Sequence, residues 1–333
     1  MSKPRIALVL GDPAGIGPEL VARLLADPRT LKMANILLIA DSKEVAKGMR
    51  LAGQHTAFVR ADSLASVSYA QSLTLLEFDT SRTTEFRSGE CNEASGRYTI
   101  QTLQIALDAV SQDLADAIVF APLNKHALHL AGMHTPDEMH WFAERLSFTG
   151  AISEFNVLDG LWTSRVTSHI AHKDVAMQLT IPGIEQAITL LYSAMRDCGV
   201  LAPRIAVCGL NPHNGDNGSF GREEIDVIAP AVQSAKAKGI PVQGPFAADT
   251  LFLKVQGEQR QFDGIVTMYH DQGQIAMKLM GFWRGVTVQG GLPIPILTPA
   301  HGTAVDIAGQ GKANPGAMQQ AFELACHMVQ NHR

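Results

Sequence analysis

Three histidines lie at the ends of expected strands, where their side chains could bind one metal ion. His169 follows the segment "LWTSRVT", His213 follows "RIAVCGL", and His270 follows "GIVTMY". Neutral imidazole is the commonest transition-metal ligand, and three of them can hold one divalent ion with an open coordination position. The set suits Zn²⁺, Co²⁺, Ni²⁺, Mn²⁺ or Fe²⁺ better than Mg²⁺, which prefers oxygen ligands. Because the three are far apart in the chain, an ordinary surface or capping role stays open for each.

Two carboxylates could take part in such a site. Asp271 follows His270 directly, so it could orient the imidazole or bind the metal itself. Asp249, in the segment "PFAADTLF", could face the same crevice. The sequence leaves open which of the two touches the metal.

A Gly-rich segment near the C-terminus could bind a dinucleotide. Residues 300–318, "AHGTAVDIAGQGKANPGAM", resemble the adenine-nucleotide loop of isopropylmalate and isocitrate dehydrogenases. The resemblance implies that His301 and Asn314 face the adenine, that Gly302 lets the backbone approach the cofactor, and that Asp306 accepts hydrogen bonds from the ribose hydroxyls. A carboxylate there repels a 2′-phosphate, which favours NAD over NADP. The alternative is an Ala/Gly-rich loop that leads into the last helix. A second Gly-rich segment, "GDPAGIGPE", fits neither a Rossmann fingerprint nor a P-loop, and alone it predicts a tight turn.

Alternating strands and helices must position these residues. Apolar runs typical of strands occupy residues 5–10, 35–40, 116–121, 204–210, 264–269 and 285–290. Helical spacing of apolar residues occurs over 17–27, 92–110, 181–195, 221–239 and 314–330. This alternation predicts an α/β fold with a mostly parallel sheet covered by helices on both faces. Ligands in such folds bind beyond the carboxyl ends of the strands, where the three histidines are expected.

Composition excludes several classes of partner. The chain of 333 residues is 46% hydrophobic and 18% charged, which is typical of a globular protein with a sizeable core. The formal net charge is −5 and no dense basic block occurs, so we expect neither a nucleic acid nor an anionic membrane surface as the main partner. No apolar segment approaches the ~18 residues of a membrane span. The four cysteines lack metal or pairing spacing, which favours a reducing cytoplasm.

Seven segments in the same order resemble the 4-hydroxythreonine-4-phosphate dehydrogenase family of pyridoxine biosynthesis. They are "GDPAGIGPE", "APLNKHALHLAG", "GLNPHNGDNGSFGREEID", "GPFAADTLF", "MYHDQG", "KLMGFWRGV" and "HGTAVDIAGQGKA". The resemblance implies that His169, His213 and His270 bind a divalent metal, with Zn²⁺ first among the candidates. It also implies a homodimer whose active site lies between two domains and takes one metal ligand from the partner subunit. The implied fold is similar to isopropylmalate dehydrogenase: two α/β/α domains, over 1–135 plus 300–333 and over 136–299.

The resemblance also implies a two-step reaction. A metal would bind the substrate hydroxyl and lower its pKa, so that a hydride can pass to NAD. The resulting 3-keto acid would then lose carbon dioxide. Lys278 and Asp271 are the candidates for the proton donor.

Departures from the family pattern concern the substrate. Glu138 and Met139 fall where the family has a His-Thr pair, Thr287 falls where it has an asparagine, and Ile296 falls near its arginine, whereas Lys278 remains. Fewer phosphate donors and more apolar surface favour an unphosphorylated substrate, such as the cis-dihydrodiol carboxylate of the related terephthalate dihydrodiol dehydrogenases.

Several alternatives stay open. One is a true 4-hydroxythreonine-4-phosphate dehydrogenase in which His134 and Thr135 replace the missing pair. Another is a phospho-sugar-acid dehydrogenase. A phosphate acyltransferase shares a similar fold but needs neither the histidines nor the dinucleotide loop. A non-enzymatic sensor of metal or nucleotide is the remaining alternative.

Overall fold

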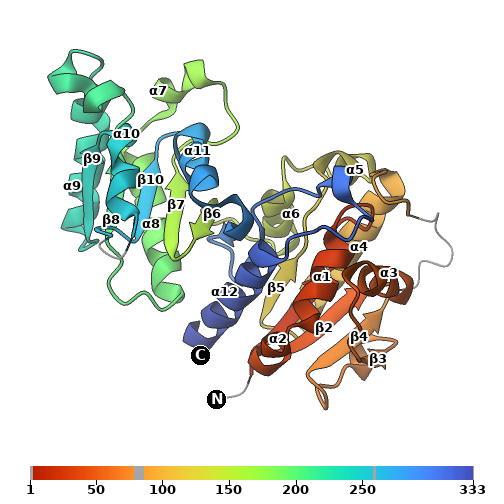
Figure 1. The fold of residues 1–333 in the computed structure, drawn as a ribbon. Helices are drawn as coiled ribbons and strands as arrows, with labels where there is room; N and C mark the ends of the chain where they lie inside the picture. Colours follow the sequence, from red (N-terminus) through yellow and green to blue (C-terminus); the bar gives the residue numbers. More distant parts are fainter. Residues whose placement is uncertain (1–2, 79–85, 258–259, 333) are drawn as a thin grey trace. The chain divides into compact units, whose positions relative to one another are not determined.

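The computed structural model describes residues 3–78, 86–257 and 260–332 (Figure 1). These residues form two compact units, the first over 1–149 with 292–333 and the second over 150–291. The sequence placed the boundaries at 135/136 and 299/300 instead. The difference arises because helix α6 (Glu138–Arg145) and strand β12 (Ile296–Pro299) supply core residues to the first unit. The predicted α/β fold with mostly parallel strands is confirmed.

The first unit contains a parallel sheet. Its strand order is β3 (Val59–Ala61), β4 (Leu73–Glu77), β2 (Asn35–Ala40), β1 (Arg5–Val9), β5 (Ala117–Phe120) and β12. Neighbouring strands in this order pair in parallel. Residues Ile6 to Val9 are fully buried, as expected for a strand covered on both faces. From β1 the chain first adds strands on the β2 side of the sheet and then, with β5, on the opposite side. The carboxyl ends of β1 and β5 therefore mark a position where α/β folds bind ligands.

Helices cover both faces of this sheet. Ala7, Val9 and Leu37 pack into one core cluster with Leu103 and Phe142, which come from α4 and α6. Because side chains alternate along a strand, Ile6 and Leu8 point to the opposite face. Helix α1 lies beside α3 and α12 (Figure 1). The helical elements of the first unit are α1 (Gly17–Ala26), α2 (Pro28–Met33), α3 (Ser42–Ala52), η1 (Leu64–Ser66), α4 (Glu93–Ser111), α5 (Lys125–Leu130), α6, η7 (Val305–Ile307) and α12 (Gly316–His332).

The second unit contains a mixed sheet. Its strand order is β11 (Val286–Gly290), β6 (Ser153–Leu158), β7 (Leu161–Arg165), β10 (Gly264–Thr267), β8 (Ile205–Cys208) and β9 (Val242–Phe246). Strand β6 runs antiparallel to β11 and β7, whereas β7, β10, β8 and β9 run parallel. The β6–β7 hairpin turns through Asp159 and Gly160, which both have positive φ, as a tight two-residue turn requires.

The helical elements of the second unit follow these strands. Helix α11 begins directly after β10 and carries Ala276, Met277 and Met280 against a core cluster that includes Ile265 and Phe262. The elements are η2 (His172–Asp174), α7 (Val175–Gln178), α8 (Ile181–Asp197), η3 (Pro212–Gly218), the π-helical turn η4 (Glu224–Ile228), α9 (Ala229–Ala237), α10 (Ala248–Leu251), η5 (Phe252–Val255), α11 (His270–Gly281) and η6 (Phe282–Arg284).

Candidate active site

The three histidines follow three adjacent parallel strands of the second unit. His169 comes after β7, His270 opens α11 directly after β10, and His213 lies in η3 after β8. The sheet order β7-β10-β8 places the carboxyl ends of these strands side by side. The sheet topology therefore brings the three loops to one edge of the second unit.

Two of the three imidazoles come close together within one chain. The rings of His169 and His270 lie 6.0 Å apart between centroids. His213 instead contacts Phe220, at 6.3 Å between centroids. Among the residues that the structure describes, no group of three or more His, Cys, Asp or Glu side chains is placed to hold a metal ion. The metal trio stays a prediction, and within one chain only part of it is brought together.

Asp271 orients the imidazole of His270. Its Oδ1 atom lies 2.7 Å from Nδ1 of His270, and Oδ2 lies 3.9 Å from Nε2 of His172. The hydrogen bond with His270 lowers the pKa of Asp271, so the carboxylate is ionised at neutral pH. His172 is a residue that the sequence analysis missed, although the segment "HIAHKD" places it three residues after His169. Asp249 is the second residue of the short helix α10, without a described contact to this group of residues.

Both loop histidines have an unusual backbone conformation. His169 has φ of 54°, and His213 begins a run in which residues 213–217 all have positive φ. Such backbone costs roughly 1–2 kcal/mol for each residue that is not glycine. Asn and Asp tolerate it best, which explains the segment "HNGDN". Strained backbone of this kind clusters at functional sites.

Glu224 holds the loop that carries His213. Its Oε1 atom accepts hydrogen bonds from the backbone N–H groups of Leu210 and Asn211, each at 2.7 Å. Its Oε2 atom accepts one from Nδ2 of Asn211 at 2.9 Å. Burial alone would raise the pKa of Glu224, but the bonds from Asn211 and Leu210 outweigh it, so the pKa is lowered. The sequence suggested no role for Glu224, because an acidic residue in a helical segment is ordinarily exposed.

Thr287 and Lys278 lie in the second unit. Thr287 is 6% exposed on β11, and its Oγ1 atom accepts a hydrogen bond from Nδ2 of Asn156 at 3.1 Å. Lys278 is exposed on α11. It lies two helical turns after His270, with Gln274 between them on the same face. This face of α11 therefore presents an imidazole, a carboxamide and an ammonium group.

Glu138, Met139 and Ile296 belong to the first unit. Glu138 is the first residue of α6, and Met139 behind it is buried. Ile296 is fully buried in the core cluster of the first unit, on β12. The expectation that Ile296 adds apolar surface at the substrate site is therefore wrong, because core packing against β5 occupies that side chain. Thr135 donates to the backbone oxygen of Asp137, next to the start of α6.

The predicted dinucleotide loop follows β12 in the first unit. Burial lowers the pKa of His301, so its imidazole is neutral at pH 7. A Cβ atom at Gly302 would meet nothing within 4 Å, which leaves room for a ligand beside the backbone. Asp306 is exposed in η7. Asn314 has a local role that the sequence did not suggest, since its Oδ1 atom accepts the N–H of Gly316 at the start of α12.

The "GDPAGIGPE" segment supports this loop. The N–H of Ile16 donates to the backbone oxygen of Thr303, and a Cβ at Gly15 would lie 2.8 Å from that oxygen. The carboxylate of Asp12 is 1% exposed and accepts from the N–H of Ala14 and the hydroxyl of Ser95. The segment is thus more than the tight turn predicted from its sequence, because it packs directly against the dinucleotide loop.

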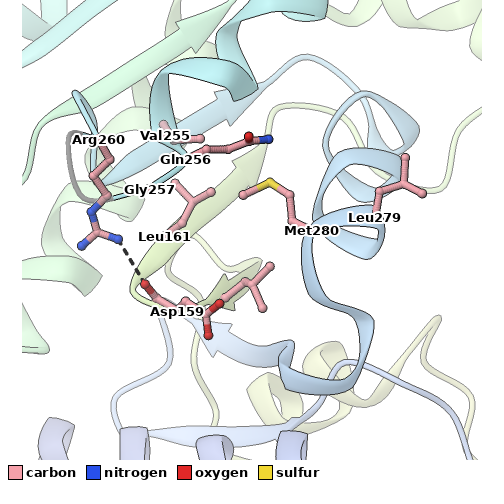
Figure 2. Close-up of a pocket in the computed structure, with 9 residues that line it drawn as sticks. Asp159, Leu161, Val255, Gln256, Gly257, Arg260, Leu279 and Met280 are labelled. Atoms are coloured by element: carbon pink, nitrogen blue, oxygen red, sulfur yellow. Dashed lines mark hydrogen bonds between the residues drawn. The ribbon is translucent and has the colours of Figure 1, made fainter.

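An open pocket of about 570 Å³ lies at the other end of the strands of the second unit. Figure 2 shows Leu161, Met280 and Asp159 around it, with Arg260 donating to the backbone oxygen of Asp159 at 3.1 Å. Leu161 is the first residue of β7, whereas His169 follows the last. This pocket is therefore separate from the histidine edge.

Comparisons with known proteins agree on one family. The family model described as pyridoxal phosphate biosynthetic protein PdxA matches residues 32–325. A Pseudomonas aeruginosa protein, provisionally named 4-hydroxythreonine-4-phosphate dehydrogenase 2, is 60% identical over 98% of this chain and 97% of its own. A Geobacter metallireducens protein named 4-hydroxythreonine-4-phosphate dehydrogenase is 38% identical over 98% of this chain and 96% of its own.

Solved structures give the same result. The 4-hydroxythreonine-4-phosphate dehydrogenase of Klebsiella pneumoniae has a TM-score of 0.84 and 35% identity, with 99% of both chains covered. The terephthalate 1,2-cis-dihydrodiol dehydrogenase of Burkholderia xenovorans has a TM-score of 0.65 and 25% identity, with 98% of both chains covered. Within the described residues, no helix is long and apolar enough to cross a membrane.

Proposed function

Because this chain belongs to the PdxA family of pyridoxal phosphate biosynthetic proteins and its relatives are named as dehydrogenases, we propose that it is a 4-hydroxythreonine-4-phosphate dehydrogenase. The observation that carries the proposal is similarity over almost the whole chain to proteins with that name. The unphosphorylated substrate favoured by the sequence has less support, since the dihydrodiol dehydrogenase is the more distant structure. The buried position of Ile296 also removes one argument for an apolar pocket.

A divalent metal and NAD complete the proposed enzyme. Bound metal supplies Lewis acidity to a substrate hydroxyl, and NAD supplies the hydride acceptor. The donor set fits a transition metal such as Zn²⁺, because His169 and His270 approach each other and Asp271 orients the second ring. His213 would complete the set in a homodimer that shares the site between subunits. Oxidation at C3 gives a β-keto acid, which loses carbon dioxide readily.

The residues around the dinucleotide loop fit NAD. His301 is neutral and can both donate to and accept from an adenine, and Gly302 leaves space beside the backbone. The exposed carboxylate of Asp306 can accept from both ribose hydroxyls. Lys278, exposed on α11, can hold an anionic group of the substrate or return a proton after carbon dioxide leaves.

A substrate panel tests this function. The metal-loaded enzyme is mixed with NAD and one acid at a time, and NADH absorbance is followed. The panel contains 4-hydroxythreonine 4-phosphate, unphosphorylated 4-hydroxythreonine, a phosphorylated sugar acid and a cis-dihydrodiol carboxylate. We expect the highest kcat/KM with the first compound. A higher value with either unphosphorylated acid would contradict the proposal, and a higher value with the phosphorylated sugar acid would reassign the substrate within the same chemistry.

Metal analysis tests the histidine trio separately. Alanine at His169, His213 or His270 should remove most bound metal and most activity, beyond the ~10–100-fold loss that follows from changing a residue outside the ligand set. His140 is a matched control, because it is exposed and bonds to Asp137 at the start of α6. Full metal content in His270→Ala would exclude the trio.

A further inference from the structure

A buried polar network lies directly behind Thr287 in the second unit. Its centre is Arg165, the last residue of β7, which is 8% exposed. The guanidinium donates from Nη2 to Oε2 of Glu154 at 2.5 Å, from Nη1 to Oδ1 of Asn156 at 3.0 Å, and from Nε to the hydroxyl of Ser168 at 2.9 Å. An arginine is rarely buried unless its charge is paired, and Glu154 provides that pairing. The polar groups of the network therefore form their hydrogen bonds with one another, and Arg165 is held in one position.

Arg165 determines which way the amide of Asn156 faces. A guanidinium can only donate hydrogen bonds, so the atom of Asn156 that faces it must be the oxygen. The amide of Gln274 donates to the same oxygen. The Nδ2 group of Asn156 must then face the other way, toward Thr287, and it donates to Oγ1 at 3.1 Å.

This orientation leaves the Thr287 hydroxyl as a donor. Its oxygen already accepts from Asn156, so its own proton must go to a different acceptor. In the part of the chain that the structure describes, no side chain or backbone oxygen accepts that proton. A donor held in this way suits an anionic oxygen, because hydrogen bonds to charged acceptors are the strong ones.

The network also joins this hydroxyl to helix α11. Gln274 lies one turn after His270 and one turn before Lys278 on the same helix face. Its bond to Asn156 therefore connects the face that presents both groups to the residue that orients Thr287. The contacts that orient the hydroxyl therefore also hold the helix that carries the exposed Lys278.

We propose that Asn156, held by Arg165, orients the Thr287 hydroxyl to donate a hydrogen bond to an anionic oxygen of the substrate. Thr287 is then a specificity-determining residue, and Asn156 and Arg165 are positioning residues that do not touch the substrate. The inference rests on the proposed function, since it concerns the substrate of that reaction. The anionic oxygen belongs to either a carboxylate or a phosphate group.

Three variants test the proposal. Thr287→Val removes the hydroxyl at nearly constant size, and Thr287→Ser keeps it. In Asn156→Asp, the carboxylate still accepts hydrogen bonds from Arg165 and Gln274, but it has no N–H group to donate to Thr287. The Thr287 hydroxyl then donates its proton to this carboxylate instead of to the substrate. We expect Thr287→Val and Asn156→Asp to raise the substrate KM roughly 10- to 100-fold, with kcat and the KM for NAD little changed. Thr287→Ser should stay close to wild type.

A double-mutant cycle separates this role from a simple charge effect. If Asn156 acts through the hydroxyl, Asn156→Asp should add little in the Thr287→Val background. Additive effects would overturn the proposal, and so would an unchanged KM in Thr287→Val. Thermal unfolding of each variant identifies any loss of folding, and a variant that unfolds early is replaced by Thr287→Ala, which must raise KM in the same way.

The substrate panel distinguishes the two anions. A penalty in Thr287→Val that appears only with 4-hydroxythreonine 4-phosphate assigns the contact to phosphate. An equal penalty with unphosphorylated 4-hydroxythreonine assigns it to the carboxylate. Wild-type enzyme that turns over neither compound contradicts the proposed function, whereas wild-type turnover with no penalty in Thr287→Val contradicts this inference alone.

Discussion

Asp306 is the residue on which we expect cofactor choice to depend. Its carboxylate is exposed in η7, within the predicted dinucleotide loop, where it would repel the 2′-phosphate of NADP. Asp306→Ser should therefore narrow the ratio of kcat/KM for NAD over NADP by roughly tenfold or more, because one repulsion between like charges is lost. Asp306→Glu keeps the charge and should keep the preference. Wild-type enzyme that uses both cofactors equally would show that Asp306 does not face the ribose.

Glu224 is expected to stabilise the fold in a pH-dependent way. Its carboxylate is 3% exposed, and its pKa is lowered from 4.5 because the hydrogen bonds from Asn211 and Leu210 outweigh the effect of burial. A lowered pKa stabilises the folded state above about pH 4.5, and this contribution is lost as the pH falls through the folded-state pKa. Glu224→Gln should lower the free energy of unfolding by about 1–3 kcal/mol at pH 7.

Urea unfolding at pH 7 and pH 4 measures this effect. The difference between wild type and Glu224→Gln should shrink at the lower pH. Asp226→Asn is the control, because Asp226 forms an exposed pair with Arg222 and should contribute little at either pH. A difference that is the same at both pH values would exclude the carboxylate as its source.

At the scale of elements, the left-handed run over residues 213–217 predicts an unusual response to substitution. Asp216 is exposed and has φ of 42°, a conformation that glycine adopts freely and a β-branched residue resists. Asp216→Gly should leave the free energy of unfolding unchanged or slightly raised. Asp216→Val should be less stable than Asp216→Gly by about 1–2 kcal/mol. The midpoints of thermal unfolding show which of the two variants is the more stable.

The same pair of substitutions at Gln243 provides a control. Gln243 is exposed on strand β9, where backbone is extended and valine is favoured over glycine. The order of stability should therefore reverse. If Val were preferred at both positions, the loop that carries His213 would not require left-handed backbone.

Strands with an unbroken apolar run could be predicted from the sequence, and the polar strand β6 could not. Residues 5–10 and 264–269 correspond to β1 and β10 because continuous apolar runs are typical of buried parallel strands. Strand β6 was missed because Glu154 and Asn156 look like loop residues. Their partner, Arg165, lies on the next strand, and the sequence does not show that pairing.

The candidate site, too, could be predicted from the sequence only in part. The order of parallel strands follows from general rules, so the placement of three histidines at strand ends could be expected. What surrounds them could not. The role of Glu224 depends on a turn of left-handed residues, and the burial of Ile296 depends on pairing between β12 and β5. The second is a contact between segments far apart in the chain.

At the scale of the whole molecule, the proposed homodimer with a shared metal site can be tested by complementation. His213→Ala and His270→Ala chains are each expected to be inactive. If these two ligands of one site come from different subunits, a hybrid dimer has one site with both defects and one site with none. Random mixing should then restore roughly a quarter of wild-type activity, measured by NADH absorbance. Absence of recovery after confirmed subunit exchange would place both ligands in one chain.

The second unit should fold without the first. Residues 150–291 are continuous in the chain and contain a core cluster around Ile265, Phe262 and Leu251. We expect this segment, expressed by itself, to unfold cooperatively when heated. Residues 1–149 alone are the matched control and should aggregate, because β5 lacks its neighbour β12 and the core lacks Ile296. Non-cooperative melting of the second unit would contradict its independence.

The first unit consists of two separate segments of the chain, and this has a consequence for folding during translation. Strand β5 leaves the exit tunnel early, but its neighbour β12 is translated only after residues 150–291. At ~5–20 residues per second, the nascent chain carries an open sheet edge for roughly ten to thirty seconds. Meanwhile the segment between them can complete its own fold. The first unit thus begins to form first but is completed last. Chaperones that bind exposed sheet edges should therefore contact this protein during that interval rather than after its release from the ribosome.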